Sequence, residues 1–395
     1  MGLVILFLQS VLAARLKWVS RPYGFDMVIR YHKYMAGAAL FFLLLHPVLL
    51  AAGGAGWQLL LSAEKPSIIW LGRAALFLLL LNAVVSVYQG RLNIKFEKWR
   101  IMHNVIVPVI LLAGFVHARF TGHDLAHLFP LRTHFLVLLV IAFAVFVYHR
   151  FIRPARLART PHQVVEVLPE TKDVWTVKMR PPEGTRHFDY LPGQFQFITF
   201  RRGRDLPVEE HHWTISSSPT QNFISATIKV LGDFTATIGA TRPGDEAVIH
   251  APFGRFSYAL HPEEKQLVFI AGGIGVTPLM SMLRHMRDSR KDISVLFFYA
   301  NKNEADIVFR KELDEIASGE YPRLRLVHVL EEADEGWQGE KGVIDQDMIK
   351  RYCDPISGLT FYLCGPPGLI ESNFHGLQSL GVEDRQIRLE LFTFL

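Results

Sequence analysis

Two apolar segments of this sequence each carry a pair of histidines fourteen residues apart. His32 and His46 lie in IRYHKYMAGAALFFLLLHPVLL, and His103 and His117 lie in WRIMHNVIVPVILLAGFVHARF. In an α-helix this spacing corresponds to about 21 Å along the axis and about 320° of rotation, so both imidazoles of a pair lie on nearly one face. Ionisable side chains inside apolar spans are costly and usually functional. The pattern predicts two helices whose four histidines ligate the iron of two stacked haems.

The two halves of the chain differ in composition. Residues 1–150 contain only four acidic residues, Asp26, Glu64, Glu97 and Asp124, between long apolar runs, which is typical of a membrane domain. From about residue 151 onward, short strands, Gly/Pro turns and charged helices alternate, as they do in soluble α/β proteins. The net charge of +5 comes mainly from the flanks of the apolar runs, so nucleic acid is not needed to explain it.

About five spans are expected, over residues 2–16, 27–51, 67–88, 99–119 and 133–152. The first segment is short for a span, so it either lies obliquely or continues into Trp18. It also resembles the apolar core of a signal peptide. It lacks a preceding basic region and is followed by Arg15 and Lys17, which favours a retained helix.

Basic residues in the loops predict the orientation. They cluster between the first and second segments and between the third and fourth, at Arg15, Lys17, Arg21, Arg30, Lys33, Arg91, Lys95, Lys98 and Arg100. The other two loops offer only Lys65, Arg119 and Arg132. Basic loops stay in the cytoplasm. We therefore expect a protein of the bacterial inner membrane with its N-terminus outside the cell membrane and its soluble half in the cytoplasm.

This orientation also predicts how the histidines pair. The second and fourth segments run parallel, so His32 is level with His103 near the cytoplasmic face, and His46 is level with His117 near the outer face. Small residues on these segments let a porphyrin approach the backbone or let helices pack closely. They are Ala36, Gly37, Ala38, Ala39, Ala113 and Gly114.

The soluble half contains two kinds of cofactor-binding pattern. LPGQFQF, HHWTISSSP and IKVLGDFT, over about residues 161–260, are typical of a β-barrel edge that holds a flavin, and Gly232 lets the backbone approach a bulky ligand. In LVFIAGGIGVTPLMSMLRHM, a strand and a glycine turn precede a helix that starts near Thr277, and such a start binds pyrophosphate. A later strand ends at Cys364, where ligands lie in open α/β sheets.

In their order, HHWTISSSP, GDFT, AGGIGVTP, CGPPG and ELFTFL match the ferredoxin-NADP reductase-like domain. Joined to the two histidine helices, the chain resembles the ferric reductase and NADPH oxidase superfamily, and most closely its compact bacterial members. The resemblance implies a multi-domain fold: a helical di-haem membrane domain over residues 1–152, a cytosolic antiparallel FAD-binding β-barrel over 153–262, and an α/β NAD(P)-binding domain over 263–395. It implies an oxidoreductase that moves electrons from NAD(P)H through FAD and two b-type haems to an acceptor outside.

The resemblance also implies roles for individual residues. FAD would contact the HHWTISS and GDFT segments, with Thr214 nearest the flavin ring, at His211, Trp213, Thr214, Ser216, Ser217, Gly232, Asp233, Phe234 and Thr235. The dinucleotide would bind at Gly272, Gly273, Gly275, Thr277, Gly365 and Pro366. Cys364 would lie beside the hydride-transferring carbon. The family often has proline where this chain has His212, so the local loop conformation is expected to differ.

Cys364 and the chain end complete the expected hydride site. Cys353 and Cys364 form neither a disulfide framework nor a zinc pattern, and structural burial suits Cys353. In such reductases a terminal aromatic stacks on the flavin and moves away for the nicotinamide. Phe394 is the first candidate for that role and Phe392 the second, and both also suit anchoring of the last strand.

NADPH is favoured over NADH on a narrow argument. The strand SVLFFYA is followed by Asn301, Lys302 and Asn303, with no carboxylate at its immediate end to repel a 2′-phosphate. Lys302 or Arg310 suits that phosphate, and either also suits a solvated surface.

Three features lie toward the expected outer face. Arg73 either pairs with a haem propionate near the acceptor or reaches lipid headgroups. His123, Asp124 and His127 suit a transient metal site less well than a polar interfacial helix. Trp57 and Trp70 suit interfacial anchors.

Superoxide formation from O2 is the leading expectation for the acceptor, and ferric-chelate reduction is the second. A third reading is an electron-supplying subunit for an extracytoplasmic protein, although no protein partner is evident in the sequence. A membrane-tethered flavin reductase without haem is the simplest alternative.

Overall fold

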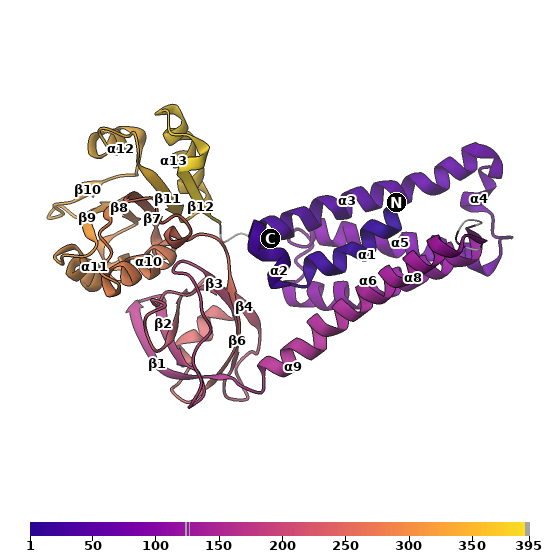
Figure 1. Cartoon of the computed structure of the whole chain (residues 1–395), viewed down its shortest axis with the longest axis horizontal. Coiled ribbons are helices and arrows are strands. Elements are labelled where there is room, and N and C mark those ends of the chain that lie inside the picture. The colour runs from indigo at the N-terminus through magenta and orange to yellow at the C-terminus, as the bar shows by residue number, and fades with distance from the viewer. Residues whose placement is uncertain (123–124, 126, 392–395) are drawn as a thin grey trace. The chain divides into compact units, whose positions relative to one another are not determined.

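The computed structural model describes residues 1–122, 125 and 127–391. The chain forms two compact units, Met1–Arg156 and Leu157–Leu395 (Figure 1).

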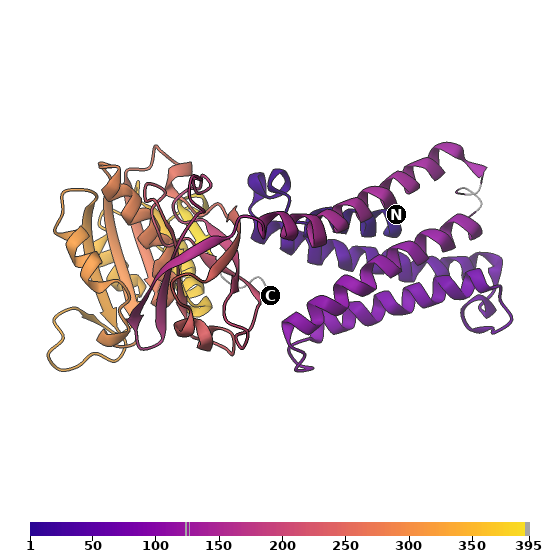
Figure 2. The same cartoon turned by 90° about the horizontal axis from the view of Figure 1, so that it is seen from below.

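The first unit is helical, and its long helices run side by side in both views (Figures 1 and 2). Within the described residues, four stretches are long and apolar enough to span a membrane: Phe25–Ala55, Ser67–Tyr88, Phe96–Thr121 and Phe129–Leu157. The elements are α1 (Gly2–Ala13), α2 (Lys17–Tyr23), α3 (Phe25–Leu50), η1 (Ala51–Ala55), α4 (Gln58–Leu61), α5 (Ser67–Tyr88), α6 (Phe96–Thr121), α8 (Phe129–Val147), η2 (Tyr148–Ile152) and α9 (Arg153–Leu157).

The first apolar segment is bent rather than straight. Helices α1 and α2 meet at 87°, and counting this pair as one span raises the number of described spans to five. Arg15 takes a positive φ of 51° at the break, so the segment does not continue straight into Trp18. Helix α1 packs inside the unit, with Phe7 buried against Phe135 of α8 at 6.3 Å between ring centroids. The expected bundle of about five apolar helices is confirmed.

The second unit begins with an antiparallel sheet of strand order β4-β3-β6-β1-β2-β5. Its strands are β1 (His162–Thr171), β2 (Val174–Arg180), β3 (Phe195–Arg201), β4 (Glu210–Thr214), β5 (Ile224–Lys229) and β6 (Glu246–Phe253). Inward side chains such as Val177, Ile198 and Phe200 form its core. The chain after β4 returns to the opposite edge, where Ser216 N donates to Ser225 O at 2.9 Å. The sheet thus curves toward closure, as expected for a barrel.

A parallel sheet of strand order β10-β9-β8-β7-β11-β12 follows. Its elements are β7 (Gln266–Gly272), η5 (Gly273–Gly275), α10 (Val276–Asp288), β8 (Ser294–Asn301), α11 (Arg310–Ala317), β9 (Arg323–Leu330), β10 (Glu340–Lys341), α12 (Gln346–Tyr352), β11 (Thr360–Cys364), α13 (Pro367–Ser379) and β12 (Ile387–Glu390).

Alternate residues of β7 enter different cores. Phe269 packs with α10 and α11 on one face, and Ile270 packs with α12 and α13 on the other. Both faces of the sheet are therefore covered, which is the usual arrangement for parallel strands. The α/β nucleotide-binding fold expected from the sequence is confirmed.

Candidate functional site

The four histidines predicted to ligate haem come together in two pairs. His32 and His46 lie on α3, and His103 and His117 lie on α6. His32 lies near His103, and His46 lies near His117. This is the pairing that the loop charges predicted.

Helix α5 provides a hydrogen-bond acceptor for each of the two α6 histidines. The Nδ1 atom of His103 lies 3.1 Å from Asn82 Oδ1, and that of His117 lies 2.8 Å from the carbonyl oxygen of Ile68. Both oxygens are acceptors, so each ring donates from Nδ1 and leaves Nε2 as the acceptor nitrogen. A ligating histidine commonly has its other ring nitrogen held in this way, so these two residues fit haem ligation.

The packing of the unit also fits a bulky group between α3 and α6. Helix α6 packs mainly on α5 and helix α3 mainly on α1, and no extensive seam joins α3 to α6 among the described residues. The Nδ1 atom of His32 is buried and has no hydrogen-bond partner among the described residues.

Small residues of these helices serve packing on α1. A Cβ added at Gly2 of α1 would lie 3.1 Å from the Ala39 carbonyl oxygen. A Cβ added at Gly114 would lie 3.2 Å from Cδ1 of Leu3 on α1. Of the two readings given to the small residues, close helix packing therefore applies at Ala39 and Gly114.

Two residues that the sequence analysis missed fix the positions of the α6 histidines. A Cβ added at Gly72 would lie 2.5 Å from two ring atoms of His117. The Trp99 ring packs 5.3 Å from the His103 ring and donates from Nε1 to Ser86 Oγ at 3.0 Å. Neither residue belongs to a recognisable motif. By contrast, Asn82 is a lone amide within an apolar segment, and that signal was available in the sequence.

Arg73 is engaged with its own loop. Its Nη1 donates to the Ser62 carbonyl at 2.8 Å, its Nη2 donates to the Leu59 carbonyl at 2.5 Å, and its guanidinium lies 4.6 Å from the Trp70 ring centroid. These contacts hold the α4 loop on the end of α5. A role for Arg73 at the acceptor stays a prediction. In the suggested outer metal site, His123 and Asp124 lie outside the described residues.

The two predicted flavin segments meet in an aromatic cluster in the second unit. Phe234 is buried, and its ring centroid lies 4.2 Å from that of His211 and 6.1 Å from that of Trp213. Arg202 covers Phe234 at 4.9 Å and donates to the Thr237 carbonyl at 3.0 Å. HHWTISS and GDFT therefore form one surface, although fourteen residues separate them.

Local hydrogen bonds shape the GDFT turn. Thr235 Oγ1 accepts from the backbone N–H groups of Leu231 and Gly232 at 2.8 and 2.9 Å. Asp233 Oδ1 accepts from Phe234 N at 3.0 Å. Because a Cβ at Gly232 would meet nothing within 4 Å, the space beside this turn is open to a ligand.

Three predicted flavin contacts, Thr214, Ser216 and Ser217, are buried. Ser216 Oγ bonds Ser225 and Thr227, and Ser217 Oγ bonds Tyr190 and the backbone of Ser225. The two serine side chains therefore point into the protein, whereas His211 and Trp213 keep partly exposed rings. His212, at the departure from the family pattern, packs on Phe195 and Phe197.

The predicted dinucleotide residues converge at the carboxyl ends of β7 and β11. These strands are parallel neighbours, and Ala271 is paired with Cys364. A Cβ at Gly275 would lie 2.3 Å from the Cys364 carbonyl oxygen, and one at Gly272 would lie 2.8 Å from Pro366 Cδ. Glycine is therefore required where the two turns cross. Gly273 has a φ of +51° with open space beside it, and α10 begins three residues later.

Cys364 is fully buried at the end of β11. Burial, assisted by the charge of Glu390, raises the pKa of its thiol well above the usual value. The thiol is therefore neutral near pH 7, which suits a packing role beside a hydride path rather than a nucleophile. Phe392 and Phe394 lie outside the described residues.

Both cations suggested for a 2′-phosphate have acidic partners. Lys302 lies 3.2 Å from Glu332 on an exposed surface, and Arg310 pairs with Glu304. Either cation would have to leave or share its carboxylate to bind a phosphate.

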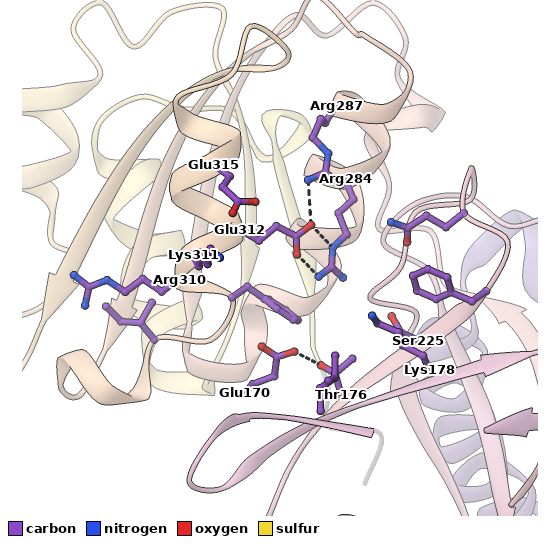
Figure 3. Close-up of a pocket in the computed structure, with 15 residues that line it drawn as sticks. Glu170, Thr176, Lys178, Ser225, Arg284, Arg287, Arg310, Lys311, Glu312 and Glu315 are labelled. Carbon is purple, nitrogen blue, oxygen red and sulfur yellow. Dashed lines mark hydrogen bonds and ion pairs between the residues drawn. The ribbon is translucent and has the colours of Figure 1, made fainter. Parts of the chain in front are cut away.

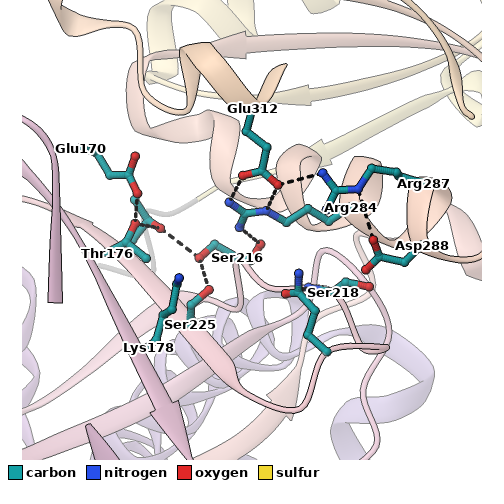
Figure 4. A network of polar contacts seen from close by, with 12 residues as sticks. Glu170, Thr176, Lys178, Ser216, Ser218, Ser225, Arg284, Arg287, Asp288 and Glu312 are labelled. Atoms are coloured by element: carbon teal, nitrogen blue, oxygen red, sulfur yellow. Dashed lines mark hydrogen bonds and ion pairs between the residues drawn. The ribbon is translucent and has the colours of Figure 1, made fainter. Parts of the chain in front are cut away.

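A cavity of about 510 Å³ lies between the antiparallel sheet and the helices α10 and α11 (Figure 3). Beside it, Arg284 of α10 donates to both carboxylate oxygens of Glu312 at 3.0 and 2.6 Å and to the Ser216 carbonyl at 2.6 Å (Figure 4). Ser281 Oγ donates to the Ser217 carbonyl at 2.6 Å. Helix α10, which begins at the dinucleotide turn, thus binds the backbone carbonyls of the HHWTISS segment. No motif in the sequence indicated this contact.

Comparisons with known proteins agree with the three parts of the chain. Residues 1–114 match the family described as ferric reductase like transmembrane component, residues 158–243 match FAD-binding domain, and residues 269–373 match oxidoreductase NAD-binding domain.

Similar curated proteins include a glycine betaine monooxygenase reductase subunit from Chromohalobacter salexigens, 32% identical over 235 residues. That match covers 58% of this chain and 62% of the relative, so the chain spans less than two thirds of its length. NADH-cytochrome b5 reductase 2 of Rattus norvegicus is 32% identical over 196 residues, which are 42% of this chain and 71% of the relative.

Among solved structures, the FAD/NAD-binding domain of a nitric oxide dioxygenase from Vibrio cholerae aligns with a TM-score of 0.53 at 22% identity. The alignment covers 59% of this chain and 98% of that one. At this identity the likeness establishes the fold.

Proposed function

Because the chain belongs to the proteins in which a ferric reductase-like transmembrane component is fused to ferredoxin-NADP reductase-like FAD- and NAD-binding domains, we propose that it carries electrons across a membrane. It is an oxidoreductase that uses FAD and a nicotinamide coenzyme. The proposed path runs from NADPH through FAD and two b-type haems to an acceptor on the far side. The observation that carries this proposal is the pair of facing histidine sets on α3 and α6, backed by α5.

Haem supplies one-electron chemistry at iron. His32 and His103 would hold the inner group, and His46 and His117 the outer group. Asn82 and the Ile68 carbonyl orient the α6 rings by accepting from Nδ1. The corresponding test is His46→Ala, which is expected to remove the outer haem and stop transmembrane transfer while NADPH still reduces FAD. Wild-type protein that never binds haem under haem-replete expression would refute the proposal.

FAD supplies the conversion of a hydride into single electrons. The HHWTISS and GDFT segments would hold it, and the turns at Gly272–Gly275 and Cys364–Pro366 would hold the dinucleotide. We favour NADPH, with Lys302 as the candidate partner of its 2′-phosphate. Lys302→Ala should then raise the KM for NADPH and leave that for NADH unchanged, whereas equal changes would exclude this role.

The proposed orientation places the FAD and NAD(P) domains in the cytoplasm and the outer haem toward the far face of a bacterial inner membrane. Basic residues in the α1–α3 and α5–α6 connections support it. With a negative-inside potential, outward electron movement is favoured by about 2.3 kcal/mol per 100 mV for a full crossing.

We propose O2 as the acceptor, with superoxide as product, because an exposed outer haem edge reduces oxygen by one electron without a catalytic acid. Sealed vesicles given NADPH on the cytoplasmic side should produce superoxide on the opposite side, suppressed by superoxide dismutase there. Negligible oxygen consumption with rapid reduction of ferric chelates would replace the oxidase with a ferric reductase. Turnover only after a periplasmic protein is added would identify an electron-supplying subunit.

A further inference from the structure

Four side chains of α5 and α6 form a closed cycle of contacts that includes His103. The imidazole donates from Nδ1 to Asn82 Oδ1 at 3.1 Å and packs on the Trp99 ring at 5.3 Å between centroids. Trp99 Nε1 donates to Ser86 Oγ at 3.0 Å, and Ser86 Oγ donates to the Asn82 carbonyl oxygen at 2.6 Å. This His103 cycle fixes both the tautomer and the orientation of the imidazole.

The cycle is built into the packing of two helices. Asn82 and Ser86 are one turn apart on α5, and Trp99 and His103 are one turn apart on α6. Side chains at this spacing lie on one face of a helix. Helices α5 and α6 pack along one another more extensively than any other two described helices of the first unit. The support of His103 therefore depends on α5 and α6 alone.

His32, on α3, has no comparable support. Its Nδ1 is buried, and neither ring nitrogen forms a hydrogen bond with another residue that the structure describes. Helix α3 packs mainly on α1 and only slightly on α5. The two histidines lie near each other but differ in what fixes them.

This difference bears on how strongly each ring binds iron. A hydrogen-bond acceptor on the second ring nitrogen orients a ligating histidine and raises its basicity, and loss of such a partner costs about 10- to 100-fold in metal affinity. A side chain without partners must also lose rotamer freedom when it binds. His103 should therefore hold iron more strongly than His32 does.

We propose that His103 anchors the inner haem and that His32 is its exchangeable ligand, with Asn82, Ser86 and Trp99 as positioning residues of the anchor. The proposal rests on the proposed function, because it needs a haem at this site. An external base such as imidazole can then replace His32 at the iron while the bond to His103 stays. The exchange leaves the charge and oxidation state of the iron unchanged, because each ring donates one nitrogen lone pair.

The first test compares His32→Gly with His103→Gly, a matched pair that removes one imidazole each from the same site. Full-length protein is expressed with ample haem and purified in detergent. His32→Gly is expected to keep the inner haem in a high-spin form that becomes low-spin when imidazole is added. His103→Gly should lose about half of the total haem, and imidazole should restore little of it.

Pyridine haemochrome and optical spectra measure these two results. Equal haem content with an equal response to imidazole in the two variants would overturn the proposal, and so would a greater loss in His32→Gly. Wild-type protein that binds no haem would instead overturn the proposed function, and this inference with it.

The second test keeps both histidines and breaks the cycle at Trp99→Leu or Ser86→Ala. Transfer of the inner haem to excess apomyoglobin is expected to be about tenfold faster, and the low-spin EPR signal of the inner haem should shift while that of the outer haem stays. Ser86→Thr keeps a hydroxyl and should remain close to wild type. Thr133→Ala is the matched control, because Thr133 Oγ1 donates to the Phe129 carbonyl on α8, outside the cycle.

The outer haem serves as an internal reference in every variant. An unchanged transfer rate and EPR signal of the inner haem in both Trp99→Leu and Ser86→Ala would overturn the positioning role. Equal changes at both haems, together with a lower unfolding temperature, would show that these contacts only hold α5 on α6, and would also overturn it.

Discussion

Gly72 illustrates how one missing side chain sets the position of a predicted ligand. Its Cα faces the His117 ring so closely that a Cβ would lie 2.5 Å from Cε1 and Nδ1. Gly72→Ala should therefore push the ring off the Ile68 carbonyl and weaken the outer haem site, reducing haem content by roughly half as measured by pyridine haemochrome. Gly53→Ala, whose Cβ meets nothing within 4 Å, is the control. Equal haem content in the two variants would contradict this prediction.

The two cysteines give a second prediction at the residue scale. Burial raises the pKa of Cys353 to about 11, and it raises the pKa of Cys364 well above the usual thiol value. Because the thiolate is the reactive form, neither residue should react with iodoacetamide at about pH 8 until the protein unfolds. Intact-mass analysis before and after denaturation measures this. Rapid labelling of the folded protein would show that one of these thiols is accessible and ionised.

At the scale of elements, α5 carries no predicted ligand but supports two. Asn82 accepts from His103 Nδ1, and an acceptor in this position raises the basicity of the ligating ring. Asn82→Leu should raise the reduction potential of the inner haem because the acceptor is lost, and Asn82→Asp should lower it because a carboxylate accepts more strongly. Spectroelectrochemical titration measures both. Shifts of the same sign in both variants would contradict a hydrogen-bonding role.

The elements also show where sequence reasoning succeeds and where it ends. Long apolar runs and alternating strands repeat a local pattern, so α3, α5, α6 and the β7-turn-α10 unit were all predictable. The backing of His103 by Asn82 joins residues on separate helices, and no periodicity records such a pairing. The inward direction of Ser216 depends on the strand β5 that pairs with it, so its motif indicated a flavin contact while its hydroxyl faces Thr227.

At the scale of the second unit, Arg284 joins three elements. It binds Glu312 of α11 and donates to the Ser216 carbonyl of the HHWTISS segment, so it ties α10 to both. Burial raises the pKa of Glu312, but the hydrogen bonds and charges of Arg284 and Arg287 outweigh it and leave the pKa below its usual value. The pair therefore adds stability above the ordinary carboxyl pKa of about 4.3, and this is lost as pH falls through the folded value.

Arg284→Met should lower the unfolding temperature by about 5 °C at neutral pH, since it leaves Glu312 and the Ser216 carbonyl without their donor. The loss should shrink in acid, and Arg284→Met with Glu312→Leu should recover much of it. Heating full-length protein while following the release of FAD fluorescence measures these changes. A double variant no more stable than Arg284→Met would show that the guanidinium acts mainly through Ser216.

The contacts of α10 bear on how such a protein can be re-engineered. A coenzyme-swapping chimera that imported residues 269–373 from another reductase would import a new α10, and with it new partners for the Ser216 and Ser217 carbonyls. The recipient flavin segment would then lose the donors supplied by Ser281 and Arg284. Exchange of the complete unit Leu157–Leu395 keeps these donors and acceptors together. The natural point for recombination is therefore the junction after Arg156, and not the boundary between the two nucleotide-binding folds.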